Sequence, residues 1–88
     1  MDYLIIGYGE KGKNIAYNLS DKKELEDNIY VYATEPILEF PKGVQFIKHD
    51  TFRNKSPDVV FIDMPFGYDA AWYNVAITWT KDVFILED

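Results

Sequence analysis

The chain has 88 residues, of which 48% are hydrophobic and 17% aromatic, and this favours one packed domain over residues 1–88. It contains no cysteine, which excludes disulfides and thiolate metal sites, and its net charge of −6 argues against nucleic acid as a partner. The apolar runs are far shorter than the ~20 residues that cross a bilayer, and no signal segment is present. We therefore expect a cytoplasmic protein with no membrane partner.

The first half of the chain predicts a strand, a helix and a second strand. Residues 3–6 are apolar and are followed by Gly7, which predicts a short strand. A helix follows, because four residues have the i, i+3, i+4, i+7 spacing of one buried stripe: Gly12, Ile15, Ala16 and Leu19. The charged segment 20–28 ends that helix, and residues 29–33 (IYVYA) predict the second strand.

The second half predicts three more strands and one helix. Residues 34–43 contain two prolines and a glycine, which indicates a loop with at most one helical turn. Residues 44–48 predict an edge strand, and residues 58–64 (DVVFIDM) predict a central strand covered on both faces. Residues 68–80 predict a helix with Asp69 as its N-cap, and residues 82–87 predict the last strand.

This order of elements predicts a minimal Rossmann-like three-layer α/β sandwich with one helix on each face of the sheet. The expected sheet is mostly parallel and five-stranded, with the strand order 3-2-1-4-5. The third strand is a point of strain, because the segment 51–57 must be almost fully extended to reach the fourth strand if strand three is parallel. We expect a parallel third strand and keep an antiparallel one as the alternative.

The turn after the first strand is a candidate phosphate site. Gly7, Gly9 and Gly12 form a G-x-G-x-x-G pattern between a strand and a helix. In this pattern the first glycine allows the turn, the second lets a pyrophosphate approach the backbone, and the third lets the helix pack on the sheet. Amides at the helix start then favour an anion. The alternative is a tight corner with no ligand.

Three charged residues bear on this turn. Glu35 lies 28 positions after Gly7, near the end of the second strand, where an acid can bind ribose hydroxyls; the alternative is a solvated loop glutamate. Glu10 counts against a phosphate, because a carboxylate in the first helical turn can occupy the helix dipole itself. Lys11 can offset that charge.

The run "IIGYGEKGKNIA" resembles the opening of NAD-binding dehydrogenase domains, in which a G-Y-G-x-x-G-K run is common. The resemblance implies NAD(P) as the cofactor, with Tyr8 inside the glycine turn. In that family an apolar run and a proline at the end of strand four lie beside the nicotinamide, and "VVFIDMP" is similar, which implies this place for Pro65. The chain lacks a normal second helix and a catalytic domain, so we expect no complete active site and no enzyme on its own.

A second resemblance is to class I S-adenosylmethionine-dependent methyltransferases. It implies acids at the ends of strands two and three, Glu35 and Asp50, and "DMPF" at residues 63–66 is similar to that family's D-P-P-Y/F motif. Lys11 departs from the family pattern, since it stands where the third glycine of G-x-G-x-G belongs. S-adenosylmethionine is therefore the alternative cofactor.

Other polar residues support weaker hypotheses. Asp63 faces the expected cleft, or it binds amides at the start of the following helix. His49 has no Ser or Cys partner in the sequence that would indicate a triad, and an exposed histidine is the simpler interpretation. Asp50, His49 and Asp63 lack the spacing of metal ligands, so we expect no metal.

The last helix has two apolar stripes. Trp72 and Trp79 lie on one stripe and are expected in the core. Ala70, Tyr73 and Ile77 form a second stripe on another side, which should be exposed in an isolated domain. We expect a homodimer or another protein partner at this surface. The main alternative to cofactor binding is therefore a non-catalytic protein-interaction module whose glycines serve only the turn.

Overall fold

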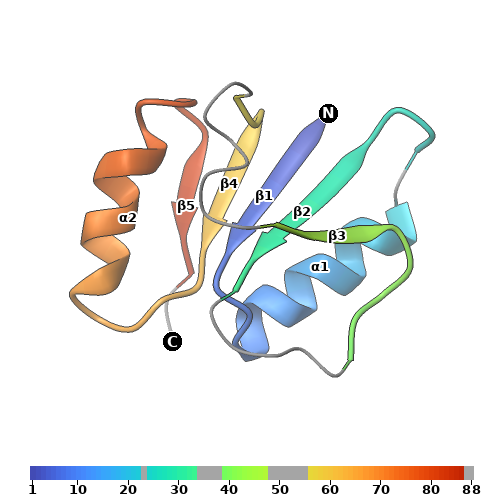
Figure 1. Cartoon of the computed structure of the whole chain (residues 1–88), viewed down its shortest axis with the longest axis horizontal. Coiled ribbons are helices and arrows are strands. Elements are labelled where there is room, and N and C mark those ends of the chain that lie inside the picture. Colours follow the sequence, from blue (N-terminus) through green and yellow to red (C-terminus); the bar gives the residue numbers. More distant parts are fainter. Residues whose placement is uncertain (23, 34–38, 48–55, 87–88) are drawn as a thin grey trace.

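The computed structural model describes residues 1–22, 24–33, 39–47 and 56–86. Within these ranges it contains five strands and two helices (Figure 1). In chain order they are β1 (Asp2–Ile6), α1 (Glu10–Lys22), β2 (Asn28–Tyr32), β3 (Val44–Ile47), β4 (Val59–Ile62), α2 (Tyr68–Ala76) and β5 (Val83–Ile85). The predicted sequence of elements is therefore confirmed.

The five strands form one parallel sheet with the order β3-β2-β1-β4-β5, as predicted. The antiparallel alternative for β3 is wrong, because Ile29 of β2 pairs with Val44 and Tyr32 pairs with Ile47 in parallel register. Residues 39–43, which precede β3, lie against α1. Glu39 contacts the amino-terminal part of α1, and Lys42 accepts a hydrogen bond from Ser20 near its end. This path lets β3 begin at the same edge of the sheet as β2, as parallel pairing requires.

Each face of the sheet is covered by one helix, which gives the predicted three layers (Figure 1). Side chains alternate between the two faces because the period of a strand is two residues. On one face, Ala76 of α2 packs with four buried strand residues: Leu4, Ile6, Val60 and Ile62. On the other face, Ala16 of α1 packs with Ile5, Ile29 and Val31. β1 lies at the centre and contributes to both cores.

Both helices end differently from the prediction. α1 continues through Lys22, into the charged segment expected to end it. α2 ends at Ala76, four residues before the predicted end at Thr80. After Ala76 the amides of Thr78 and Trp79 bond to the third preceding carbonyl, and the Thr78 hydroxyl donates to the Val75 carbonyl at 2.6 Å. Such a hydroxyl competes with the continuing helix for backbone acceptors.

Asp69 is not the N-cap of α2, so that prediction is wrong. The cap position is Gly67, whose φ is +95°, and no side chain bonds to the helix from there. The Asp69 carboxylate instead accepts bonds from the amides of Gly67 and Ala70, at 3.1 and 2.7 Å. The reason is that Pro65 and Gly67 turn the chain earlier, and the Pro65 carbonyl accepts the amides of Tyr68 and Asp69.

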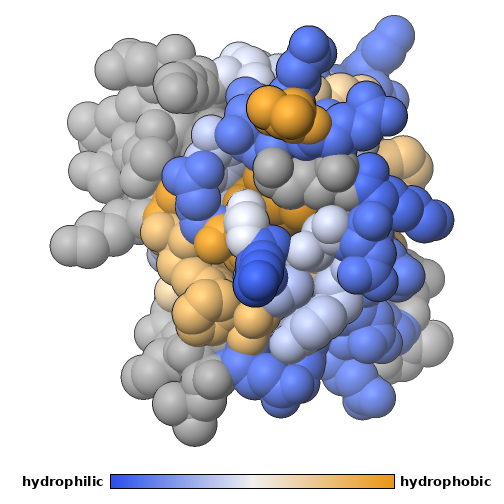
Figure 2. Space-filling view, turned by 90° about the vertical axis from the view of Figure 1, so that its right-hand side faces the viewer, coloured by the Kyte–Doolittle hydropathy of each residue, from blue (hydrophilic) through white to orange (hydrophobic). Residues whose placement is uncertain are grey.

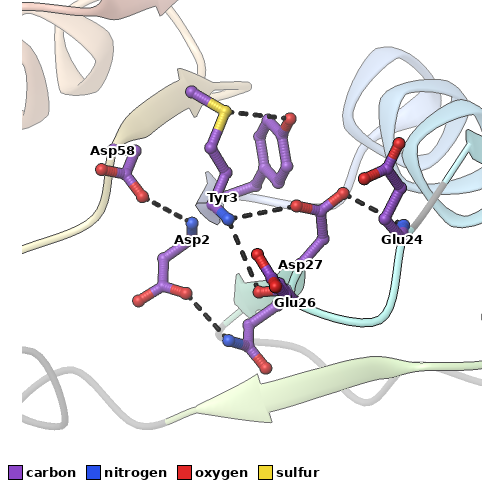
Figure 3. A network of polar contacts seen from close by, with 8 residues as sticks. Asp2, Tyr3, Glu24, Glu26, Asp27 and Asp58 are labelled. Carbon is purple, nitrogen blue, oxygen red and sulfur yellow. Dashed lines mark hydrogen bonds and ion pairs between the residues drawn. The ribbon is translucent and has the colours of Figure 1, made fainter.

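A polar network closes the amino edge of the sheet (Figure 3). The Met1 ammonium contacts Asp27 at 3.1 Å, and the amide of Asp2 donates to Asp58 at 2.7 Å. The side chain of Asn28 donates to Asp2 at 2.9 Å, which joins β2 to β1. These contacts lie where β2, β1 and β4 begin, so they help to hold the three adjacent strands in register. No helix within the described ranges has the length and apolar character to cross a membrane.

Candidate functional site

The glycine turn lies at the carboxyl edge of the sheet, between β1 and α1. Gly7 has a φ of +89°, a conformation that residues with a side chain rarely adopt. Its amide donates to the Tyr32 carbonyl at 2.7 Å, which continues the pairing of β1 with β2. A Cβ atom on Gly7 would overlap the Asp63 carbonyl oxygen. Gly7 is therefore required both by the turn and by the close approach of the chain after β4.

Gly12 lets α1 pack against this turn. It is buried, and a Cβ there would lie 2.9 Å from the Gly7 carbonyl oxygen and 3.0 Å from Oδ2 of Asp63. Both distances are shorter than ordinary contacts of carbon with oxygen. The absence of a side chain at position 12 therefore brings the first turn of α1 close to the ends of β1 and β4.

The side chain of Asp63 lies at the N-terminal end of α1, which we call the mouth of α1. Its Oδ2 accepts a hydrogen bond from the Gly12 amide at 2.8 Å. A Cβ on Gly9 would lie 2.7 Å from the same oxygen, so the missing side chain of Gly9 makes room for the carboxylate. Gly9 immediately precedes α1, where a Ser or Asp side chain would usually accept one of the first helical amides. Asp63, from a different strand, supplies that acceptor instead.

The prediction for Asp63 was therefore partly wrong. The sequence left two roles for Asp63, facing the expected cleft or capping the following helix. The carboxylate caps a helix, but it is the first one, at Gly12, 51 residues earlier in the chain. The reason is tertiary: the amide of Asp63 donates to the Ile6 carbonyl, so β4 ends beside the glycine turn. No spacing rule in the sequence relates Asp63 to Gly12.

The charges around this mouth are mixed. Asp63 and Glu10 bring two carboxylates to the first turn of α1, where the helix dipole favours negative charge. Lys11 is half-buried, and Lys13, whose side chain is 38% exposed, is bound to Glu39. In the part of the chain that the structure describes, no three His, Cys, Asp or Glu side chains are grouped so that they could hold a metal ion.

Tyr8 points away from this mouth, toward the segment 39–43 that lies against α1. Its hydroxyl donates to the Glu39 carbonyl at 3.1 Å, and its ring meets the ring of Phe46 edge to face at 6.0 Å. Burial raises the pKa of the Tyr8 hydroxyl; neighbouring Tyr17 and Glu39 add to this, while Lys13 opposes it. Tyr8 thus serves as a packing residue between β1 and β3 in this structure.

Glu39 is a second residue whose role the sequence did not indicate. Its carboxylate contacts the Lys13 ammonium at 3.0 Å and accepts the Tyr17 hydroxyl at 3.4 Å. The bond to Lys13 lowers the pKa of Glu39, and the same bond raises the pKa of Lys13. These contacts attach the chain before β3 to α1, which is the place where a second helix lies in larger Rossmann-like domains.

Of the remaining predicted site residues, the structure describes only Pro65. Pro65 is exposed in the loop after β4, where its carbonyl accepts the first amides of α2. Glu35 lies outside the described residues, as do Asp50 and His49, so their predicted roles stay predictions. The described part of the site therefore consists of the glycine turn and Asp63.

Two apolar surfaces are exposed at opposite ends of the sheet. Figure 2 shows the side that carries β3, where hydrophobic residues gather within a mostly hydrophilic surface. Phe46 of β3 and Phe40, which precedes that strand, are exposed, and their ring centroids lie 5.0 Å apart. At the other end, α2 exposes both Tyr73 and Ile77, as the second stripe predicted. Trp72 and Trp79 pack toward the core, also as predicted.

The outer surface of α2 is the larger of these two. The helix, the loop before it and the C-cap residue Ile77 expose five large apolar side chains: Phe66 (98%), Tyr68 (65%), Tyr73 (38%), Val75 (44%) and Ile77 (46%). Ala70 and Asn74 are exposed between them. We use the name α2 face for the outward residues Ala70, Tyr73, Asn74 and Ile77.

The chain was compared with known proteins at three levels. No family model matches it, no curated protein matches it, and no solved structure matches it.

Proposed function

We propose that this chain is a non-catalytic protein-interaction module with a Rossmann-like fold, and that the α2 face is its binding surface. The observation that carries the proposal is the Asp63 carboxylate at the mouth of α1, 2.8 Å from the Gly12 amide. The position at which a Rossmann-like domain receives a pyrophosphate is filled here by an anion of the chain itself. The glycines then serve the turn and the close packing of α1.

Electrostatics supports the same proposal. A phosphate at this mouth would lie beside the carboxylates of Asp63 and Glu10, on a chain with a net charge of −6. Like charges at this separation repel, and the repulsion is largest where water is partly excluded. Binding would also require the Asp63 carboxylate to leave its amide donor. The repulsion and the loss of the Asp63 hydrogen bond both disfavour an anionic ligand.

The α2 face supports the binding part of the proposal. Exposed apolar side chains gathered on one helix of a small domain are typical of a surface that another protein covers. The segment 66–80 contains one charged residue, Asp69, although 27% of the whole chain is charged. The carboxylate of Asp69 is bound to two backbone amides of its own turn. The surface therefore carries almost none of the charged side chains that usually make an exposed helix face hydrophilic.

Cofactor binding is the second candidate, favoured by the position of the glycine turn. The turn lies where the strand order reverses between β1 and β4, and ligands of open α/β sheets bind at such points. In this alternative, NAD(P) contacts Gly7, Tyr8, Gly9, Lys11, Gly12, Glu35 and Pro65, and the pyrophosphate displaces Asp63. S-adenosylmethionine, which has no phosphate, is the other cofactor of this candidate.

A thermal-shift titration separates the two candidates. We expect NAD, NADP and S-adenosylmethionine at millimolar concentration to leave the melting temperature unchanged. A ligand at a hundred times its Kd would add about 2.7 kcal/mol of stability, so even weak binding is detectable. A rise with any of the three, absent in a Gly9→Val variant, would overturn the proposal in favour of a cofactor domain.

The binding surface is tested by a photo-reactive amino acid in the intact chain. Placed at Tyr73 in expressing cells, it should form covalent adducts with protein. The matched control is the same amino acid at Asn14, which is exposed on α1. Adducts at Asn14 but not at Tyr73 would show that the α2 face is not the surface used.

A further inference from the structure

We propose that the partner of the α2 face is a second copy of this chain, bound through α2 packed antiparallel to the partner's α2 across a twofold axis beside Asn74. This inference rests on the proposed function, because it names the occupant of the same surface. It follows from the orientation of α2, from the chemistry of Asn74, and from the shape and charge of the surrounding residues.

Asn74 lies on the side of α2 that is opposite the core. Ala76 is buried and Trp72 packs on the same core, so these two residues define the inward side of the helix. Asn74 is two positions from each of them. With about 100° of rotation per residue, it points roughly 160° away from both. The axis of a pair of helices packed through this side therefore passes near Asn74.

An asparagine at this place favours a copy of the same chain over an apolar partner. Its amide has both donors and an acceptor, so two Asn74 side chains related by a twofold axis can satisfy one another. An apolar partner surface would bury the same amide without bonds, which costs about 1–3 kcal/mol. A single asparagine at the centre of a helix pair also selects one alignment of the two helices.

The residues around Asn74 have complementary sizes in this arrangement. Antiparallel pairing about position 74 places residue 77 of one copy opposite residues 70 and 71 of the other. Ile77 is large and exposed, whereas Ala70 and Ala71 are small and exposed. Each isoleucine can therefore lie over the two alanines of the partner, and the helices can approach to about 8–10 Å.

The charge distribution is compatible with two identical acidic chains. Each copy carries a net charge of −6, so two copies repel unless the contact is made through neutral surface. The α2 face contains no charged residue, and Asp69 at its edge is bonded to the amides of Gly67 and Ala70. A basic partner would gain no electrostatic attraction from this face, because the carboxylates of this acidic chain lie on other parts of its surface.

The available area is that of a weak dimer. A whole aromatic side chain offers about 150–250 Å², so the exposed fractions of Tyr73 and Ile77 in the α2 face, together with those of Phe66, Tyr68 and Val75 outside it, correspond to roughly 500 Å² per copy. A pair would then bury about 1,000 Å², which is the lower limit for a specific interface. We therefore expect a dimer that dissociates on dilution in the micromolar range.

Charge substitutions at the axis provide the first experiment. Sedimentation velocity of the wild-type chain should show concentration-dependent dimers. Asn74→Asp and Asn74→Lys should each raise the dissociation constant at least about tenfold, because each places two like charges together. An equal mixture of the two variants should restore dimers. The matched controls Asn14→Asp and Asn14→Lys, on exposed α1, should leave dimerisation unchanged.

A cysteine scan provides the second experiment, since the natural chain has no cysteine. Under mild oxidation, Asn74→Cys should form a disulfide-linked dimer much faster than Asn14→Cys, because a disulfide requires Cα atoms within about 7 Å. Circular dichroism confirms that the variants are folded. A monomer at all concentrations, or no restoration in the mixture of charge variants, would overturn the second copy as partner.

The mass of the photo-adduct at Tyr73 distinguishes failure of the homodimer proposal from failure of the proposed interaction surface. Adducts at Tyr73 of twice the chain mass support self-association. Adducts of other masses at Tyr73, with none at Asn14, would overturn the homodimer and leave the proposed interaction surface in place. No adduct at Tyr73 would overturn both proposals.

Discussion

Oδ2 of Asp63 lies 2.8 Å from the backbone nitrogen of Gly12 and accepts its hydrogen. This bond joins the end of β4 to the first turn of α1 and supplies the cap that Gly9 cannot provide. Its anion is covalently part of the protein, so the Gly12 amide has an acceptor without a ligand.

Removing the Asp63 carboxylate should destabilise the domain. Asp63→Ala leaves the Gly12 amide without its acceptor and removes a negative charge from the favourable end of the helix dipole. We expect a loss of about 1–2 kcal/mol in the free energy of unfolding, the usual cost of losing a cap. Urea denaturation measures it. Asp63→Asn keeps an oxygen acceptor without the charge, so its stability should lie between those of the wild-type chain and Asp63→Ala. Equal stability of all three proteins would contradict the proposed cap.

Adding a methyl group at Gly9 should displace the same carboxylate. Gly9 does not have positive φ, so alanine is compatible with the backbone, but its Cβ would lie 2.7 Å from Oδ2 of Asp63. Gly9→Ala should therefore destabilise the wild-type chain by about 1 kcal/mol or more and destabilise the Asp63→Ala variant by less. A double-mutant cycle measures the difference. Additive effects would show that Gly9 and Asp63 are not coupled.

The Glu39–Lys13 pair should make stability depend on pH. The pKa of Glu39 is lowered from 4.5 by its bond to Lys13, so its contribution is present above pH 4.5 and is lost as the pH falls through the lower, folded value. The pKa of Lys13 is raised from 10.5, so its contribution is lost only as the pH rises beyond that value.

The measurement compares the urea midpoints of the wild-type chain and Glu39→Gln at several pH values. We expect a small difference at neutral pH, because both side chains are exposed, and its loss in acid. High salt at neutral pH should reduce the same difference. A difference that persists unchanged at pH 3 would contradict the ion pair as its source.

The Met1 ammonium should titrate above its ordinary value. A hydrogen bond from the ammonium to Asp27 raises its pKa from 8.0; desolvation opposes the shift, and the charges of Asp27, Asp58 and Asp2 add to it (Figure 3). The stabilisation is full below pH 8.0 and is lost as the pH rises through the folded value. An NMR titration of the amine measures the shift. Asp27→Asn should bring the pKa back toward 8.0, and an unchanged value would contradict the contact.

Local patterns in the sequence correctly predicted most of the architecture. The apolar run before Gly7, the i, i+3, i+4, i+7 stripe of α1 and the continuous apolar residues of β4 each depend on neighbours in the chain, and all three elements formed. The parallel order followed because strands that alternate with helices can be connected in few ways. The end of α2 was predicted less well, since the bond between Thr78 and the Val75 carbonyl has no signature in the periodicity.

The sequence alone determined the composition of the glycine turn, the acidic charge and the second apolar stripe of α2, because each is a property of residues close together in the chain. Only the tertiary structure decided what fills the turn. Asp63 reaches Gly12, 51 positions away in the chain, because β4 pairs with β1, and Glu39 reaches Lys13 because residues 39–43 lie against α1. Contacts of this kind depend on which strands are neighbours in the sheet, and no local pattern records that.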